Sequence, residues 1–236
     1  MDRETRIWAI VLAFVLLLIL VIVTYQKNQD YQIKIAQLET ELTVRKEETE
    51  REIKGLQEAQ KILIEENKEL KEKLKRYETL SDYLERRLRA SNKGIEDELV
   101  NVIVTVFWDQ VNTYGFEAEK ALAWIEQESN FKITAISKKG AVGLTQVLPT
   151  TGQEAARKMN IEWRGTKTLM DPVTNLKIGF CYLNWCRERP VVKTEHQIFS
   201  AYFWGIGNLQ KNSLDETVYS REIFERANQL RRMENV

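Results

Sequence analysis

Hydrophobic and polar positions divide the 236-residue chain into three unlike segments, of which the first is apolar throughout. Residues 7–23 form a run of seventeen without a charged or polar side chain, and Thr24 and Tyr25 extend the run to nineteen. About 20 apolar residues span a bilayer as a helix, and aromatic rings such as those of Trp8 and Tyr25 favour its interfaces. The pattern predicts one transmembrane helix within residues 1–25.

The residues that flank this span indicate how it is used. A cleaved signal peptide would need a shorter apolar core and a cleavage site of small residues, and residues 24–27 supply no such site. An uncleaved anchor is therefore favoured. Arg3 and Arg6 precede the span, whereas Lys27 and Lys34 follow it. The positive-inside rule then weakly favours a cytoplasmic N-terminus.

The second segment, residues 26–93, is strongly charged: 31 of its 68 residues are Asp, Glu, Lys or Arg, with no proline and one glycine. Apolar residues recur every seven positions, and a second set recurs between them, as at the a and d positions of a coiled-coil heptad. The apolar members are Ile35, Leu42, Leu56, Leu63, Leu70, Tyr77 and Leu84, with Ile53, Leu74 and Leu88 as partners; Thr49, Gln60, Asn67 and Ser81 are polar. This pattern predicts a homo-oligomeric coiled coil. The alternative is a single solvated helix with Glu and Lys pairs one turn apart. At ~1.5 Å per residue, either would extend on the order of 100 Å and act as a spacer.

The third segment, residues 94–236, begins at Gly94, where the charge density falls, and contains five of the six tryptophans. We expect helices at 95–114, 116–129, 171–187, 195–205 and 215–233, and a further helix opened after Pro149 by a capping box at 151–154. Gly115 is a typical helix stop, and Asp171 with Pro172 a typical start. No window alternates as a strand over six residues. The segment is therefore predicted to be one all-α domain, with at most a short hairpin in its loops.

Composition narrows the function classes. Lys plus Arg and Asp plus Glu each total 35, so the formal net charge is zero and nothing suggests a nucleic-acid partner. His196 is the only histidine, so no cluster indicates a metal site, and no cofactor is expected. Cys181 and Cys186 lie five residues apart, which separates them by about 140° around a helix. We expect two buried thiols there and no disulfide.

One carboxylate stands out from the solvated majority. Glu128 falls near the end of an apolar predicted helix, with Trp124 one turn before it on the same side and Phe131 just after it. A carboxyl group shielded from water by aromatic rings has a raised pKa, because desolvation disfavours the ion. A raised pKa suits a general acid that protonates a leaving oxygen near neutral pH. Taken alone, a glutamate at a helix end is more often a surface cap or a member of an ion pair.

Motifs around and after Glu128 resemble those of a known family. The residues are Glu128 to Phe131, Ser137, Gly140 to Gln146, Pro149 and Thr150; then Asp171, Pro172, Asn175, Gly179, Tyr182 and Leu183; then Ala201 and Tyr202. Their order and spacing resemble the signature of soluble-lytic-transglycosylase (SLT) domains, which belong to the lysozyme-like superfamily with goose-type lysozymes. The resemblance covers about residues 121–207 and does not extend to the anchor or the charged segment.

The resemblance implies a lysozyme-like fold and cleavage of the β-1,4 bond between MurNAc and GlcNAc in peptidoglycan strands. It implies Glu128 as the sole acid/base. Ser137 and Gln146 would line the cleft and hydrogen-bond the acid or the sugar N-acetyl group, and Tyr202 would support Glu128 from across the cleft. The substrate also implies a place for the domain outside the cytoplasmic membrane, in the periplasm or extracytoplasmic space.

The same resemblance implies that the backbone at Gly143 and Leu144 approaches the glycan, which would explain a glycine there. The sequence departs from the family at three positions. Phe203 stands where the family has Asn, Trp204 where it has Ala, and Thr145 where Met is frequent. Phe203 offers a stacking face in place of the hydrogen-bonding amide through which asparagine could contact a sugar.

The absence of a second carboxylate from these motifs narrows the expected mechanism. Most glycosidases use two carboxylates, and substrate-assisted enzymes are an exception. Glu126 lies two residues before Glu128 and therefore points to a different helix face. The sugar N-acetyl group would attack its own anomeric carbon while Glu128 protonates the leaving oxygen. Glu128 would then deprotonate the muramoyl 6-hydroxyl, which gives the 1,6-anhydro end that the resemblance implies.

Three alternatives stay open at this point. Water in place of the 6-hydroxyl would make the same site a hydrolytic muramidase. A non-catalytic scaffold that only grips glycan or a partner would fit Phe203, Trp204 and the long charged segment. A lytic domain in a secretion, conjugation or phage-entry machine would use the same chemistry.

Overall fold

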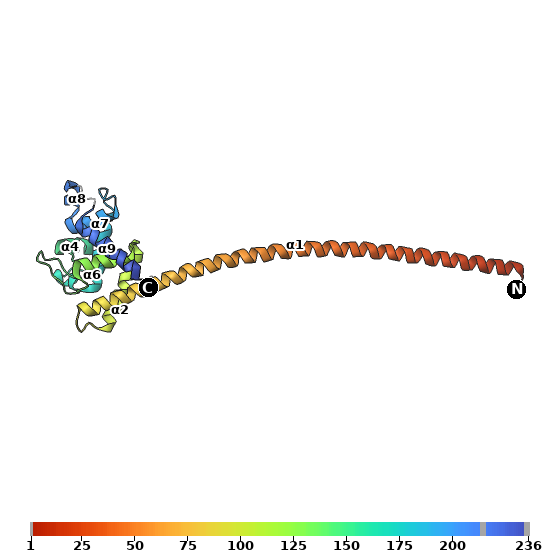
Figure 1. Cartoon of the computed structure of the whole chain (residues 1–236), viewed down its shortest axis with the longest axis horizontal. Coiled ribbons are helices and arrows are strands. Elements are labelled where there is room, and N and C mark those ends of the chain that lie inside the picture. Colours follow the sequence, from red (N-terminus) through yellow and green to blue (C-terminus); the bar gives the residue numbers. More distant parts are fainter. Residues whose placement is uncertain (1, 213–215, 234–236) are drawn as a thin grey trace. The chain divides into compact units, whose positions relative to one another are not determined.

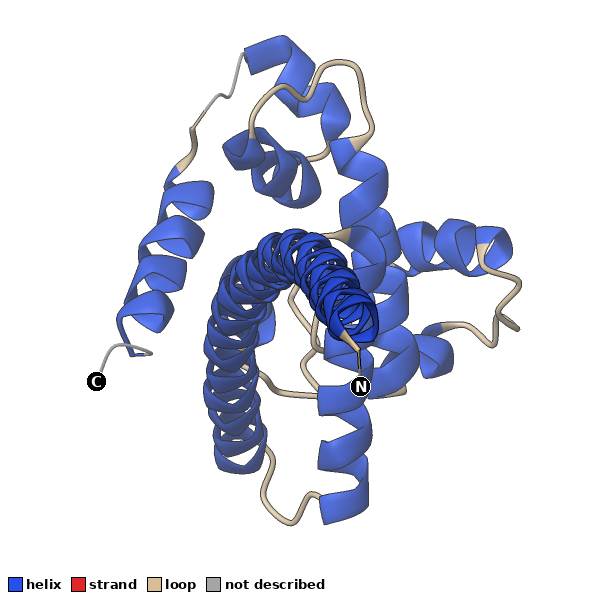
Figure 2. Cartoon of the chain, turned by 90° about the vertical axis from the view of Figure 1, so that its right-hand side faces the viewer, coloured by secondary structure: helices blue, strands red, loops and turns tan. Residues whose placement is uncertain are grey.

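The computed structural model describes residues 2–212 and 216–233, and within these ranges it consists of helices and loops without a strand (Figure 2). The contacts divide the chain into two units, Met1–Leu70 and Lys71–Val236. Helix α1 (Arg3–Ser91) contributes residues to both units, and the other helices belong to the second (Figure 1). The prediction of an all-α fold with a long N-terminal helix is confirmed.

In the first unit, α1 leaves every described side chain exposed. Among the residues that the structure describes, α1 is the one helix that is long and apolar enough to cross a membrane. The heptad residues Leu42, Leu56 and Leu63 are 56%, 70% and 57% exposed. An apolar surface of this extent is typical of contact with lipid or with another chain. Exposed ion pairs such as Arg51–Glu47, 3.6 Å apart, would equally fit the solvated alternative. The transmembrane helix and the homo-oligomeric coiled coil stay predictions.

The second unit begins well before the boundary that composition indicated at Gly94. Leu80, Leu84 and Leu88 of α1 are buried in the core of this unit, at 1%, 2% and 0% exposure. Leu84 and Leu88 are therefore not free for the coiled-coil seam to which their spacing assigned them. An a/d repeat and a core-facing helix stripe share nearly the same period, and the period does not identify the partner.

Eight further helices lie in the described part of the second unit (Figure 1). They are α2 (Asp97–Tyr114), α3 (Ala118–Ser129), α4 (Pro149–Lys158), α5 (Thr166–Met170), α6 (Pro172–Arg187), α7 (Glu195–Trp204), α8 (Ile206–Asn212) and α9 (Val218–Met233). Helices α5 and α8 were not predicted, because five and seven residues are too few to show a helical period. The expected start of the last helix, Asp215, lies outside the described residues.

The helix ends follow local sequence signals at most positions. Gly115 adopts a left-handed φ of 63° after α2, and the Asp171 side chain accepts a hydrogen bond from the Thr174 amide to cap α6. The predicted capping box at 151–154 is wrong. Helix α4 begins at Pro149, with Leu148 at the N-cap. Proline lacks an N–H and has its φ preset for the first helical turn, so it starts the helix without a side-chain cap.

The core of the second unit forms where α3 meets α9 and where α6 meets α2 and α7. Trp124 of α3 is fully buried, with its ring edge-on to Phe180 of α6 and Tyr202 of α7, at centroid distances of 5.4 and 5.0 Å. These contacts fix the end of α3, where Glu128 lies. Loop residues Ile136, Val142 and Val147 form isolated bridges, which correspond to the short hairpin that the sequence allowed.

Leu88→Ala is expected to destabilise the second unit by ~2–5 kcal/mol, because it removes buried methyl groups and leaves a cavity. Leu63→Ala removes the same groups from an exposed position of the same helix, so it should leave the unfolding of the second unit unchanged. Urea denaturation of the 236-residue chain in detergent, followed by tryptophan fluorescence, measures both. Equal effects of the two substitutions would contradict the placement of Leu88 in the core.

Candidate active site

The site is built around Glu128, the last residue but one of α3. The helix ends there because Asn130 and Phe131 adopt left-handed φ angles of 51° and 61°. Such angles are strained for residues other than glycine, and surrounding contacts must hold them. The end of α1 supplies those contacts. The Ser91 hydroxyl donates to the Asn130 carbonyl (2.6 Å), and the Asn92 amide donates to the Phe131 carbonyl (2.9 Å).

The hydrogen-bond partner of Glu128 is Tyr219, a buried residue in the first turn of α9. The Tyr219 hydroxyl donates to Glu128 Oε1. This residue was not among the sequence predictions. It lies 91 residues away in the chain and outside the motifs that carried the resemblance. Only its apolar setting in an amphipathic helix was visible in the sequence, and that setting does not reveal a polar partner.

Burial raises the pKa of Glu128 to about 7 from its usual 4.5, and the Tyr219 hydrogen bond opposes the rise. The direction agrees with the expectation from Trp124, which lies one turn before the acid and is fully buried. Burial, and after it the negative charge of Glu128, raises the pKa of Tyr219 well above its usual value. Tyr219 therefore stays a hydrogen-bond donor at physiological pH.

Tyr202 is also buried beside the acid, but its hydrogen bond goes elsewhere. Its hydroxyl donates to the Thr145 carbonyl at 2.7 Å, and its pKa is raised first by burial and then by the charge of Glu128. The hydroxyl of Tyr202 thus bonds the loop and not Glu128, and the support of the acid by Tyr202 from across the cleft stays a prediction. Tyr219 supplies the hydrogen bond to Glu128, and Tyr202 ties the loop after α3 to α7.

The loop between α3 and α4 is folded around Asn175 of α6. The Asn175 side-chain amide donates to the Val142 and Leu169 carbonyls at 2.8 and 3.0 Å, and its carbonyl accepts from the Thr145 amide at 2.9 Å. Gly143 has φ of 80°, and a Cβ there would lie 2.3 Å from the Asn175 amide nitrogen. Asn175 therefore accounts for a glycine at this position, and the approach of a glycan to this backbone stays a prediction.

The other substrate-binding residues expected from the resemblance also help to fold this loop. Ser137 Oγ accepts from the Ala141 amide at 3.0 Å, and the Gln146 side chain donates to the Gly143 carbonyl at 2.9 Å. Both side chains are half-buried. Leu144 packs its side chain in the core at 1% exposure, so that only its backbone is left for a ligand. Their roles in glycan binding stay predictions.

Thr145, which stands where the family often has Met, has a structural role here. Its hydroxyl donates to the Asn175 side-chain carbonyl at 2.8 Å. A Cβ added at Gly179 of α6 would lie 2.4 Å from this hydroxyl. The threonine thus packs directly on a helix backbone and adds a second bond to the Asn175 network.

Glu126 links three helices through its carboxylate. Its carboxylate accepts hydrogen bonds from Tyr83 and Arg87 of α1, both at 2.8 Å, and forms an ion pair with Arg226 of α9 at 2.6 Å. This cluster connects α1, α3 and α9 within the second unit. Two cations hold the carboxylate of Glu126, in agreement with the expectation that it faces away from Glu128.

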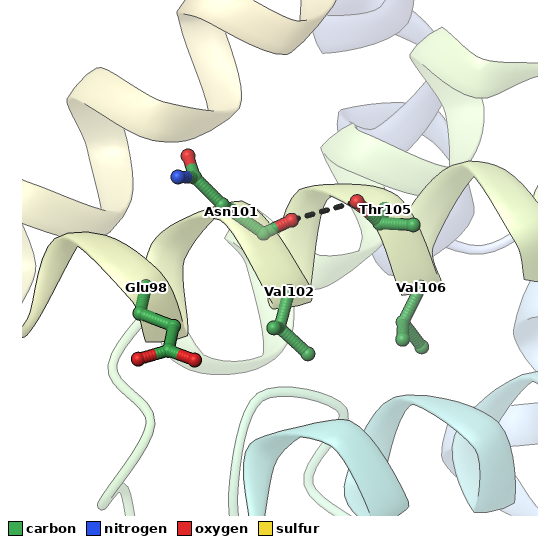
Figure 3. A pocket seen from close by; sticks show the side chains of 5 residues that line it. All are labelled: Glu98, Asn101, Val102, Thr105 and Val106. Atoms are coloured by element: carbon green, nitrogen blue, oxygen red, sulfur yellow. Dashed lines mark hydrogen bonds between the residues drawn. The ribbon is translucent and has the colours of Figure 1, made fainter.

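A separate surface pocket lies on α2 (Figure 3). It is lined by Glu98, Asn101, Val102, Thr105 and Val106, and Figure 3 shows Glu98, Val102 and Val106 on one face of the helix. None of these is a predicted site residue. Among residues 2–212 and 216–233, no group of three His, Cys, Asp or Glu side chains is arranged to hold a metal ion.

The model of the transglycosylase SLT domain family matches residues 106–223, which is half of the chain. The chain belongs to this family. The matched SLT domain includes Glu128, the Asn175-centred loop, Tyr202 and Tyr219. It therefore also includes the acid's hydrogen-bond partner, which lies beyond the residues that first carried the resemblance.

Named relatives of this SLT domain are lytic transglycosylases. Membrane-bound lytic murein transglycosylase C of Pectobacterium atrosepticum is 30% identical over 105 residues, which are 41% of this chain and 29% of that protein. Endo-type membrane-bound lytic murein transglycosylase A of Klebsiella pneumoniae is 34% identical over 82 residues, which are 33% of this chain and 39% of that protein. The chain thus spans well under half the length of these relatives.

Among solved structures, the 70 kDa soluble lytic transglycosylase of Escherichia coli is similar with a TM-score of 0.48 and 21% identity. That similarity covers 55% of this chain and 24% of that one.

The pKa of Glu128 predicts a stability that depends on pH. Between pH 4.5 and about 7 the carboxyl group ionises in the unfolded state but not in the folded state, so stability falls as pH rises and is lowest above pH 7. Glu128→Gln removes this penalty. The variant should therefore be ~2–3 kcal/mol more stable than the native chain at pH 8, and equally stable at pH 4. Urea denaturation at both pH values measures the difference, and a difference that does not change with pH would contradict the raised pKa.

Proposed function

We propose that the chain is a membrane-anchored peptidoglycan lytic transglycosylase with Glu128 as its sole acid/base. The observation that supports this most directly is a half-buried carboxyl group with a pKa of about 7, held by one tyrosine, inside an SLT domain. A pKa near the working pH lets one group give up a proton and take one back. The names of the relatives, lytic murein transglycosylases, agree with this chemistry.

In the first step of the proposed reaction, protonated Glu128 donates its proton to the oxygen of the β-1,4 bond between MurNAc and GlcNAc. The C1–O bond breaks as the MurNAc N-acetyl oxygen forms a bond to C1. GlcNAc leaves with the proton as a free hydroxyl. The Tyr219 hydrogen bond stabilises the carboxylate that remains, because a donor favours the charged acceptor.

In the second step, the Glu128 carboxylate takes the proton from the muramoyl 6-hydroxyl. The 6-oxygen attacks C1, and the bond from C1 to the N-acetyl oxygen breaks. The product is a 1,6-anhydro-MurNAc end, and Glu128 is protonated again. A second carboxylate is not needed in this scheme, and the nearest one in sequence, Glu126, is held by Arg87 and Arg226.

We further propose the topology that the sequence favours. Residues 1–25 would anchor the chain in the cytoplasmic membrane with the N-terminus inside and the SLT domain in the periplasm or extracytoplasmic space. The exposed apolar heptad positions before Lys71 would pair with a second copy of the chain, which makes a homo-oligomer. The long helix would then act as a spacer between membrane and cell wall.

Glu128→Gln is expected to abolish product formation from purified peptidoglycan by the 236-residue chain, because glutamine cannot donate or accept the reacting proton. Glu98→Gln is the matched control: it changes an exposed glutamate in the α2 pocket and should leave activity unchanged. Mass spectrometry of the soluble products measures both.

The same spectra separate the alternatives. Anhydro ends support the transglycosylase, whereas reducing ends one water heavier would identify a muramidase. Glycan binding by the native chain without any soluble product would favour a non-catalytic scaffold. Full activity of Glu128→Gln would overturn the assignment of the acid.

The pH profile tests the role of Tyr219. Because the acid must be protonated in the free enzyme, kcat/KM should fall as pH rises through about 7. Tyr219→Phe removes a hydrogen bond that lowers the pKa of Glu128, so the fall should move to higher pH. Initial rates of product release between pH 5 and 9 measure the profile, with Glu98→Gln as control. An unchanged profile or a shift to lower pH would contradict this role.

A further inference from the structure

Two neighbouring aromatic side chains are exposed at the end of α7. Phe203 is 51% exposed and Trp204 is 48% exposed, and their rings meet edge to face at a centroid distance of 5.1 Å. They stand at the positions where the family resemblance led us to expect a small polar and a small apolar residue. The helix stops directly after them at Gly205, whose φ is 82°.

The ring of Tyr219 connects this aromatic pair to the candidate acid, Glu128. Phe203 stacks on Tyr219, with a centroid distance of 4.4 Å and an interplanar angle of 19°. The Tyr219 hydroxyl in turn donates to Glu128. One face of Phe203 is therefore packed against a residue of the site. About half of its surface is left to solvent, next to the half-exposed side chain of Trp204.

From this geometry we propose that Phe203 and Trp204 form a stacking surface for a sugar ring of the glycan, beside the bond that Glu128 cleaves. The inference rests on the proposed function. A β-1,4-linked pyranose carries its ring hydroxyls at the equator and presents C–H groups on its faces. Such a face packs on an aromatic ring through apolar and C–H contacts. Ring stacking would replace the hydrogen bonds that an asparagine could offer at position 203.

The size of the surface favours a sugar over a protein partner. A buried aromatic side chain contributes 150–250 Å², so two half-exposed rings offer on the order of 200 Å². A stable protein interface needs about 800 Å² from each partner. One pyranose ring covers an area of the smaller size, and the adjacent acid acts on such a ring.

Stacking at a ring that does not react should contribute equally in the ground and transition states. Such uniform binding lowers KM and leaves kcat little changed. Phe203 also covers Tyr219, so its replacement would disturb the acid as well. Trp204 contacts Phe203, and it is the better position for a test.

The test uses the 236-residue chain in detergent and a soluble GlcNAc–MurNAc tetrasaccharide. In the Glu128→Gln background, Trp204→Ala should weaken binding by about tenfold, measured by calorimetry, which corresponds to about 1.4 kcal/mol. Trp204→Phe keeps a stacking face and should retain affinity within about threefold. Val102→Ala, in the α2 pocket, is the control and should bind as tightly as its parent.

In the active background, Trp204→Ala should raise KM for the same sugar by about tenfold with kcat within about twofold, and Trp204→Phe should restore KM. Unchanged affinity and KM in Trp204→Ala would overturn the stacking surface even if the chain forms anhydro products. If the native chain makes no product while Trp204→Ala still loses affinity, the proposed catalysis fails and the stacking surface stands. Loss of affinity in Trp204→Phe equal to that in Trp204→Ala would also overturn it.

Discussion

The hydrogen bond between Tyr219 and Glu128 joins two helices whose contact organises the rest of the domain. A partly buried acid/base needs a partner that stabilises the carboxylate but still allows it to be protonated near neutral pH. A neutral phenol does this, whereas an arginine would hold the pKa low. Glu126, two residues earlier, shows the contrast: it meets Arg87 and Arg226 and serves as an ionic joint. The domain thus places two glutamates of one helix in opposite electrostatic settings.

Much of the surrounding structure keeps α3 and α9 in register for this contact. Trp124, one turn before the acid, is fully buried against α6 and α7, and the Glu126 cluster connects α3 with α9. Tyr202 of α7 bonds the loop that follows α3, and Asn175 of α6 bonds the same loop. These contacts are distributed over α1, α6, α7 and α9, so that the position of one carboxyl oxygen depends on most of the domain.

Periodicity, caps and the SLT-like motifs were enough to predict the all-α class, the bounds of the long helices and Glu128 with its raised pKa. They could not identify Tyr219, because a residue 91 positions away in an amphipathic helix gives no sign of which polar group it meets. Gly143 shows a second limit. A glycine signals that something comes close to the backbone, but Asn175, which does so, was visible only in three dimensions. Leu84 and Leu88 show a third, since their spacing fits an oligomer seam and a domain core equally well.

Because the last turns of α1 are buried in the core, the domain defined by sequence similarity and the domain defined by compact packing differ in this chain. The segment shared with the family begins at Val106, in the middle of α2, whereas the compact unit begins at Lys71. Leu80, Leu88 and Ile103 complete the core from outside the shared segment. The segment that matches the family model, residues 106–223, is therefore shorter than the compact unit, which begins at Lys71. In this chain the last turns of the long N-terminal helix α1 cover the apolar face that the shared segment leaves open.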